Sequence, residues 1–168
     1  MKKPILILCI LLVCSCMQTR LNDAFAGSMF DTSVTRFIYL QVGNPYMTCN
    51  EVIQEIDPGR GTTPIIIPET NRCYLPLSPI VKMMDGKSYW DAKHKSITIT
   101  VKSKIIQLQI NSPKAQVGKT WMWIDRENRS VTPLIRNSRT MVPLRFVAEN
   151  IGCKVEWEPE HQFITITY

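Results

Sequence analysis

The feature that most constrains the fold is an internal repeat. Residues 71–100 align with residues 138–167 at an offset of 67 positions, with 10 identities among 30 aligned pairs. A shorter match, "LQVGNP" with "LQINSP", lies upstream of each. A repeat of this length predicts two tandem copies of one supersecondary unit, residues 37–101 and 105–168. The two copies are expected to share a sheet or to pack closely.

Each copy contains one short amphipathic segment. Apolar residues recur there at positions i, i+3, i+4 and i+7, which is one face of a two-turn helix. Pro76 and Pro143 set the entry to the two helices, and Gly152 follows the second helix, where a left-handed C-cap is expected. Because helices of two turns are not stable alone, both must pack against a sheet. The expected buried faces are Leu77, Ile80, Val81 and Met84 in the first copy, and Leu144, Val147, Ala148 and Ile151 in the second.

Alternating apolar and polar residues predict strands around these helices. Residues 97–101 and 164–168 alternate in this way, and each follows a tryptophan-containing strand through a polar turn, which predicts a hairpin. Residues 37–42 and 105–110 predict the opening strand of each copy. The short connection 102–104 folds the last strand of the first copy back onto the second copy. The expected fold class is α+β, with an antiparallel β-sheet curled around short α-helices.

The N-terminal residues predict export. Two lysines precede an apolar run that is too short to span a membrane, and "AFA" at residues 24–26 fits a cleavage site. Residues 1–26 are therefore predicted to be a secretory signal peptide, and residues 27–36 a short segment ahead of the domain. The alternative is a lipoprotein signal, in which Cys16 is acylated and attaches the protein to a membrane. A third interpretation, an uncleaved N-terminal anchor, needs a longer apolar run.

The charge pattern argues against nucleic acid as a partner. The net charge is +6, and residues 1–26 carry three basic side chains and one acidic side chain, which leaves +4 on the remainder. The basic residues are scattered among acids, so a solvated surface is expected rather than a nucleic-acid footprint. Weak attraction to anionic wall polymers or lipid head groups remains open.

The cysteine pattern leaves the thiol pairing open. Cys49, Cys73 and Cys153 remain after removal of the signal, an odd number with no C-x-x-C pair. A chain of this size can fold without disulfide bonds, so a fold held together by disulfides is not expected. The sequence fits either one disulfide bond with one buried thiol or three buried thiols. It also leaves the oligomeric state open.

Residues 137–166, "NSRTMVPLRFVAENIGCKVEWEPEHQFITI", resemble the copper amine oxidase N-terminal-like domain, a stalk domain of secreted proteins of Gram-positive bacteria. Ser138 replaces the usual glycine, and the first copy departs further, with Ser78 in place of the arginine. The resemblance extends over residues 37–168 and implies an antiparallel sheet curled around a helix. It implies no catalysis in this domain, which is elsewhere joined to hydrolases or surface modules. Because no residue follows Tyr168, the chain is expected to be the stalk alone.

The sequence gives little support for a catalytic function. Copper amine oxidases need a copper site of three histidines and a tyrosine converted to a quinone, whereas beyond the signal only His94 and His161 are present. Both histidines occupy the equivalent turn of their copy, and a turn residue retained by duplication explains them better than a metal site. No nucleophile motif, marked carboxylate pair or glycine-rich phosphate loop is found. We therefore predict no enzyme activity, no catalytic or metal-ligating residue and no cofactor.

Aromatic and basic side chains are the candidates for contact with a partner. Trp121 and Trp123 lie on one face of a strand, where packing in the core is only slightly favoured over stacking on sugar rings. Arg145 could hold an anionic partner, although a contact with the acid four residues on is the favoured role. Trp90 and Trp157 are instead predicted to fill the core beside each helix.

The sequence therefore predicts a secreted, extracellular, non-catalytic stalk or interaction module at the bacterial cell envelope. The alternative is a protein that binds cell-wall polymers or glycans through exposed aromatic and basic residues. An enzyme with an unrecognised site is the third hypothesis. The partner is an unidentified envelope protein or cell-wall polymer, and a membrane is involved only if Cys16 is lipidated.

Overall fold

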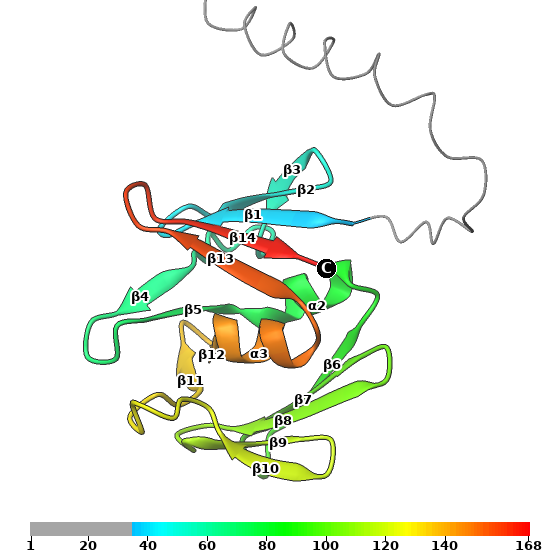
Figure 1. The fold of residues 1–168 in the computed structure, drawn as a ribbon, viewed down its shortest axis with the longest axis vertical. Coiled ribbons are helices and arrows are strands. Elements are labelled where there is room, and N and C mark those ends of the chain that lie inside the picture. Colours follow the sequence, from blue (N-terminus) through cyan, green and yellow to red (C-terminus); the bar gives the residue numbers. More distant parts are fainter. Residues whose placement is uncertain (1–34) are drawn as a thin grey trace, which may run out of the picture. The chain divides into compact units, whose positions relative to one another are not determined.

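The computed structural model describes residues 35–168, most of which lie in antiparallel strands beside two short helices (Figure 1). The predicted signal peptide, Cys16 and nearly all of residues 27–36 lie outside the described residues. Among the described helices, none has the length and apolar character needed to cross a membrane. The elements in chain order are β1 (Phe37–Gln41), β2 (Tyr46–Cys49), β3 (Val52–Glu55), β4 (Ile65–Ile67), β5 (Arg72–Pro76), α2 (Leu77–Met83), β6 (Lys87–Asp91), β7 (Ser96–Val101), β8 (Lys104–Gln109), β9 (Lys114–Val117), β10 (Thr120–Trp123), β11 (Leu134–Arg136), β12 (Arg139–Pro143), α3 (Leu144–Asn150), β13 (Lys154–Glu158) and β14 (Phe163–Thr167).

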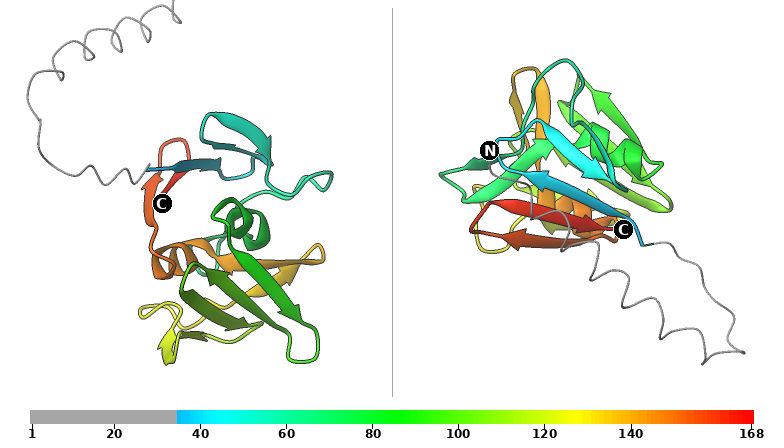
Figure 2. Two further views of the ribbon diagram at one scale, coloured as in Figure 1. Left: turned by 90° about the vertical axis from the view of Figure 1, so that its right-hand side faces the viewer. Right: turned by 90° about the horizontal axis from the view of Figure 1, so that it is seen from above.

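The strands form three sheets, where the sequence had predicted one. Sheet A has the order β13-β14-β1-β2-β3, sheet B the order β11-β12-β5-β4, and sheet C the order β10-β9-β8-β7-β6. In Figure 1, sheet A lies above helix α3 and sheet C lies below it. The left view of Figure 2 shows from a second direction that the helices lie between these two sheets. The predicted antiparallel strands and short helices are thus confirmed, and the single curled sheet is corrected.

The local hairpins follow the prediction, but the pairing of distant strands does not follow from the pattern. β6 pairs with β7, β13 with β14, and β7 with β8 through residues 102–104. The last strand, β14, pairs with the first, β1, from Phe37 opposite Thr167 to Gln41 opposite Phe163. Alternation decides which side of a strand faces the core but not which edge it joins. Sheet A therefore combines the first and the last strands of the chain, whereas sheet C consists of the consecutive strands β6 to β10.

The core lies where the inner faces of the sheets meet the helices. At the centre of sheet B, β5 and β12 run antiparallel with Leu75 opposite Val142, and both side chains are fully buried. Burial of large aliphatic side chains is the main source of stability in such a domain. The inner face of sheet A supplies the buried residues Ile38, Leu40, Ile164 and Ile166. The inner face of sheet C supplies Ile97, Ile99, Ile106 and Leu108.

Both helices bury the predicted face where it is described. Ile80, Val81 and Met84 are buried beside α2, and Leu144, Val147, Ala148 and Ile151 along α3. Gly152 has a φ of +100° after α3, as the predicted left-handed cap requires. After α2, Asp85 takes the left-handed conformation instead. Because Gly86 has no side chain, Val81 of α2 and Val101 of β7 can lie close to its backbone. A Cβ at Gly86 would lie 2.7 Å from Cγ2 of Val101.

The described cysteines are free thiols. Cys49 and Cys153 are buried and Cys73 is partly buried, so three thiols are present rather than a bridge and one thiol. The Sγ atom of Cys153 lies 3.8 Å from Sδ of Met84. Burial raises the pKa of the Cys153 thiol to about 11, so this cysteine acts as a packing residue.

Candidate functional site

Two arginine–aspartate pairs tie sheet B to the loops that leave sheets A and C. Nε of Arg139, on β12, lies 2.5 Å from Asp57, and Nε of Arg72, on β5, lies 2.7 Å from Asp125. Only about an eighth of each aspartate side chain is exposed, at 12% and 13%. These contacts give Arg72 and Arg139 a structural role. The two aspartates were missed as partners, although the repeated dipeptide Ile-Asp at residues 56–57 and 124–125 is a signal for them.

The pKa of each of these aspartates lies below its ordinary value, for different balances of causes. For Asp57, the hydrogen bond from the Arg139 guanidinium is the largest cause. For Asp125, burial is the largest single influence, and it raises the pKa. Hydrogen bonds from the backbone N–H groups of Asn128 and Glu127, together with the contact with Arg72, lower the pKa by more than burial raises it. Both carboxylates are therefore held in the charged form.

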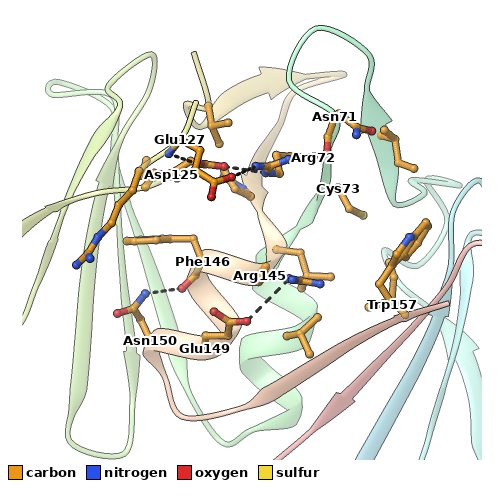
Figure 3. A pocket seen from close by; sticks show the side chains of 18 residues that line it. Asn71, Arg72, Cys73, Asp125, Glu127, Arg145, Phe146, Glu149, Asn150 and Trp157 are labelled. Atoms are coloured by element: carbon orange, nitrogen blue, oxygen red, sulfur yellow. Dashed lines mark hydrogen bonds and ion pairs between the residues drawn. The ribbon is translucent and has the colours of Figure 1, made fainter. Parts of the chain in front are cut away.

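A groove runs beside α3 and has a volume of about 600 Å³ (Figure 3). It is called the α3 groove below, and its walls include Arg145, Phe146 and Glu149 from the helix and Trp157 from β13. Nε of Arg145 lies 3.9 Å from a carboxylate oxygen of Glu149, the contact expected from the spacing of four residues. Both side chains are more than half exposed, so Arg145 remains accessible to a partner.

Trp157 and Trp90 line grooves, and the prediction that they fill the core is wrong. Trp157 belongs to the α3 groove, and Trp90 to a second groove of about 790 Å³ beside α2, the α2 groove. Each of the two tryptophan residues is 37% exposed. Each stands opposite a buried isoleucine, Ile164 or Ile97, and so does face the inner side. Because β13 and β6 are edge strands, no further strand covers the ring.

The α3 groove suits binding better than a reaction. Cys73 lines it, but burial raises the pKa of this thiol to about 12, so little thiolate forms at neutral pH. The acids of the groove face arginines: Asp125 pairs with Arg72, and Glu149 lies near Arg145. A groove with an aromatic wall and balanced charges can hold a ligand, whereas it offers no activated nucleophile.

The predicted contact residues Trp121 and Trp123 lie on β10, away from the lining of either groove. Trp121 is 62% exposed and Trp123 is 37% exposed. The ring of Trp123 is partly covered, since Arg129 Cζ lies 3.9 Å and Lys114 Nζ 4.6 Å from its centroid. These cation–π contacts occupy the Trp123 ring. Arg145 and the two tryptophans thus do not form one site.

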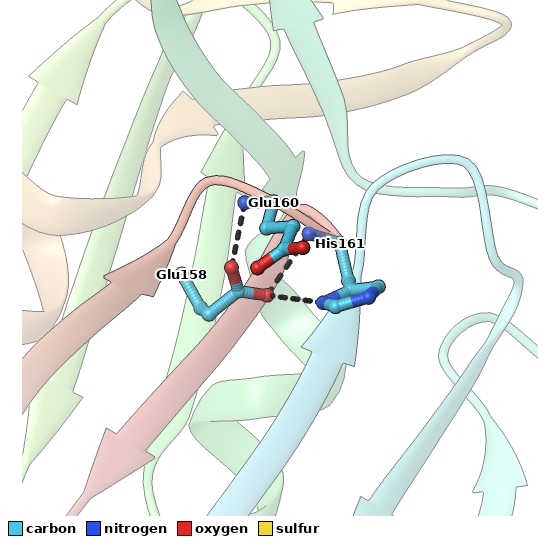
Figure 4. A group of neighbouring side chains, drawn as sticks. All are labelled: Glu158, Glu160 and His161. Carbon is cyan, nitrogen blue, oxygen red and sulfur yellow. Dashed lines mark hydrogen bonds and ion pairs between the residues drawn. The ribbon is translucent and has the colours of Figure 1, made fainter.

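The two histidines stabilise turns in different sheets. Glu158, Glu160 and His161, at the β13–β14 turn, have ligand atoms within 4.8 Å of one another (Figure 4). Glu158 accepts hydrogen bonds from the backbone N–H groups of Glu160 and His161. At the β6–β7 turn of sheet C, Asp91 accepts from the backbone N–H of His94 and pairs with its ring at 2.6 Å. Turn formation accounts for both groups.

The strands, the two short helices and the grooves beside them define a β-rich module. A family model described as "Copper amine oxidase N-terminal domain" matches residues 54–166. The chain belongs to the copper amine oxidase N-terminal domain family, whose domain is non-catalytic by itself, and the match includes no catalytic domain. No curated protein and no solved structure matched the chain. β1 and β2 precede the matched residues, yet β1 lies between β14 and β2 in sheet A.

Proposed function

We propose that the protein is a secreted, non-catalytic stalk or interaction module that acts at the bacterial cell envelope. The observation that carries this proposal is the family match, which places residues 54–166 in a non-catalytic β-rich domain. The export pattern of residues 1–26 supports the location. The accessible grooves and exposed aromatic side chains offer surfaces for a partner.

Fractionation of a Gram-positive host that expresses the tagged chain tests the location. We expect the chain in the medium or in the wall fraction, shortened by cleavage after Ala26. Ala26→Asp should block that cleavage, whereas Cys16→Ser should change nothing. Full-length protein in the cytosol would contradict the proposal. Release from the membrane only in Cys16→Ser would instead support the lipoprotein alternative.

We further propose that residues 37–101 and 105–168 are tandem copies that form one domain together. The element order from β1 to β7 recurs from β8 to β14, and the Arg72–Asp125 and Arg139–Asp57 pairs each join the two copies. The grooves beside α2 and α3 support the same view, because each is lined by residues of both copies: Arg139 and Trp90 in the α2 groove, and Arg72 and Trp157 in the α3 groove. A single unfolding transition of the whole domain is expected.

The second candidate function is binding of a glycan or wall polymer. The exposure of Trp121, at 62%, favours it, because an indole in solvent on a sheet is available for stacking. Retention of the purified chain on isolated cell wall at low salt would support this function. A chain that passes unretained would exclude it and would leave the secreted interaction module intact.

A further inference from the structure

The outer face of sheet C carries a straight row of five side chains, one from each strand. Tyr89 stands opposite Thr98, Thr98 opposite Gln107, Gln107 opposite Gln116, and Gln116 opposite Trp121. Residues directly opposite in neighbouring strands point to the same side of a sheet. These five residues form the platform row. They span β6 to β10 without interruption.

The row faces solvent over its whole length. Tyr89 is 69% exposed and Trp121 is 62% exposed at its two ends. Gln107 is exposed at the centre, and Thr98 and Gln116 are half-buried. The other face of the sheet is the core face, where Ile97, Ile99, Ile106 and Leu108 are buried. In Figure 1, helix α3 lies above sheet C, on the core side.

The length of the row suits an extended ligand rather than a compact one. Neighbouring strands lie about 4.8 Å apart, so four such steps separate Tyr89 from Trp121 by roughly 19 Å. A single sugar ring or amino acid could contact only one or two members of the row. An extended polymer lying across the strands contacts all five.

The chemistry of the row matches an uncharged carbohydrate. A sugar ring has an apolar C–H face and a rim of hydroxyl groups that both donate and accept hydrogen bonds. The rings of Tyr89 and Trp121 supply apolar surfaces, and the amides of Gln107 and Gln116 both donate and accept. Nε2 of Gln116 also donates to the carbonyl of Gly118 at 3.1 Å, which orients this side chain. The row contains no charged side chain.

The equivalent row of sheet A shows that this composition is not a property of the fold. It runs through Glu156, Thr165, Tyr39, Thr48 and Ile53. A carboxylate and an aliphatic side chain therefore occupy the two ends that are aromatic in sheet C. Of these two sheets, sheet C is the one that carries an uncharged row with an aromatic ring at each end.

We propose that the platform row binds a linear, uncharged polysaccharide laid across the strands of sheet C. Sugar rings stack on Tyr89 and Trp121, and the amides of Gln107 and Gln116 bind hydroxyl or acetamido groups between them. The proposal rests on the glycan-binding function and gives it a ligand class and a site. The row itself carries no cation, and Lys87 and Lys114 in the rows beside it share the face with Asp91, which favours a neutral chain over an anionic wall polymer.

Calorimetry with two neutral hexamers tests the site, one of β-1,4-linked glucose and one of β-1,4-linked N-acetylglucosamine. At least one hexamer should bind, and its monosaccharide should bind at least tenfold more weakly because it cannot span the row. Tyr89→Ala and Trp121→Ala should each weaken binding of the hexamer roughly three- to tenfold, as loss of one stacked ring implies. Ile53→Ala, at the equivalent end of the sheet A row, is the matched control and should bind normally.

The outcomes separate the site from the function. If the parent chain binds a hexamer and both alanine variants bind equally well, the platform row is the wrong site while glycan binding stands. If neither hexamer binds but cell wall retains the chain, the neutral ligand class is overturned. A wall interaction that disappears between 50 and 200 mM salt would point to an anionic polymer and would also overturn it. Unchanged circular dichroism spectra and melting temperatures of the variants establish that they fold.

Discussion

Sheets A and C have the same construction but differ on the side that faces solvent. Each joins a late hairpin of one half to the first three strands of the other half, and each presents isoleucine and leucine to the core. On the outside, sheet A stacks Phe37 on Tyr39, with ring centroids 6.1 Å apart, whereas sheet C carries the platform row. The shared inner faces explain the fold, and the difference between the outer faces indicates where a function can lie.

The junction between the halves should show the largest effect on stability. Leu75→Ala removes a fully buried side chain opposite Val142 and should lower the free energy of unfolding by about 2–5 kcal/mol. Because each outer sheet contains strands of both halves, chemical denaturation should still show one transition. Two transitions, one per half, would show that the halves fold independently.

Gly86 and Cys153 occupy equivalent positions after the two helices, and their difference can be tested directly. Gly86→Ala places a Cβ 2.7 Å from side-chain atoms of Val101 and Val81 and 2.8 Å from the backbone oxygen of Thr100. It should cost about 1–3 kcal/mol in thermal or urea unfolding. Cys153→Ala, where a side chain is already accommodated, should cost less. If Gly86→Ala is as stable as the parent, β7 of sheet C shifts at no cost to make room for the added Cβ, and the prediction is wrong.

The two arginine–aspartate pairs should make stability depend on pH in the acid range. The folded-state pKa of Asp57 and of Asp125 is lowered, so their stabilisation is complete above the ordinary value of about 3.9 and is lost as the pH falls through the folded value. At neutral pH each pair should contribute about 1 kcal/mol, given the exposure of its arginine. Urea unfolding from pH 6 to pH 3 measures this loss.

The double variant Asp57→Asn with Asp125→Asn should lose part of that dependence and should be less stable at pH 7. Asp85→Asn replaces an exposed carboxylate outside both pairs and is the control. A pH profile of the double variant that is parallel to the parent profile would show that other groups account for the acid sensitivity.

Arg145 should contribute least to stability. Its contact with Glu149 is 3.9 Å long, and the two side chains are 61% and 52% exposed, so Arg145→Ala should change the free energy of unfolding by no more than about 0.5 kcal/mol. A larger loss would mean that Arg145 supports the wall of the α3 groove. If Arg145→Ala loses partner binding but keeps its stability, Arg145 contacts an anionic partner, which is the role that the sequence left open for it.

The fold was predictable where local pattern decides it. Val147 and Ala148 are buried on the predicted helix face, and the hairpin at residues 102–104 follows from two strands joined by a short turn. The pairing of β14 with β1 was not predictable, because alternating strands are compatible with several partners. The division into three sheets follows from that long-range pairing.

The candidate site was predictable only in part. That Trp121 and Trp123 share one face followed from strand alternation, but the exposure of that face did not. Trp157 was assigned to the core because its strand could not be recognised as an edge strand. Gln107 and Gln116 carry no motif of their own. They become informative only when the register aligns them with Tyr89 and Trp121, and register is a property of the assembled sheet.

The most direct measurement is an amide NMR titration of the ¹⁵N-labelled chain with the hexamer of β-1,4-linked N-acetylglucosamine, with the glucose hexamer in parallel. Shift changes should gather on β6 to β10 at members of the platform row, and the indole N–H of Trp121 should move with them. The equivalent positions in sheet A, such as Ile53, should stay unchanged. Changes confined to the α3 groove or to sheet A, or no change with either hexamer, would contradict the assignment of the function to the outer face of sheet C.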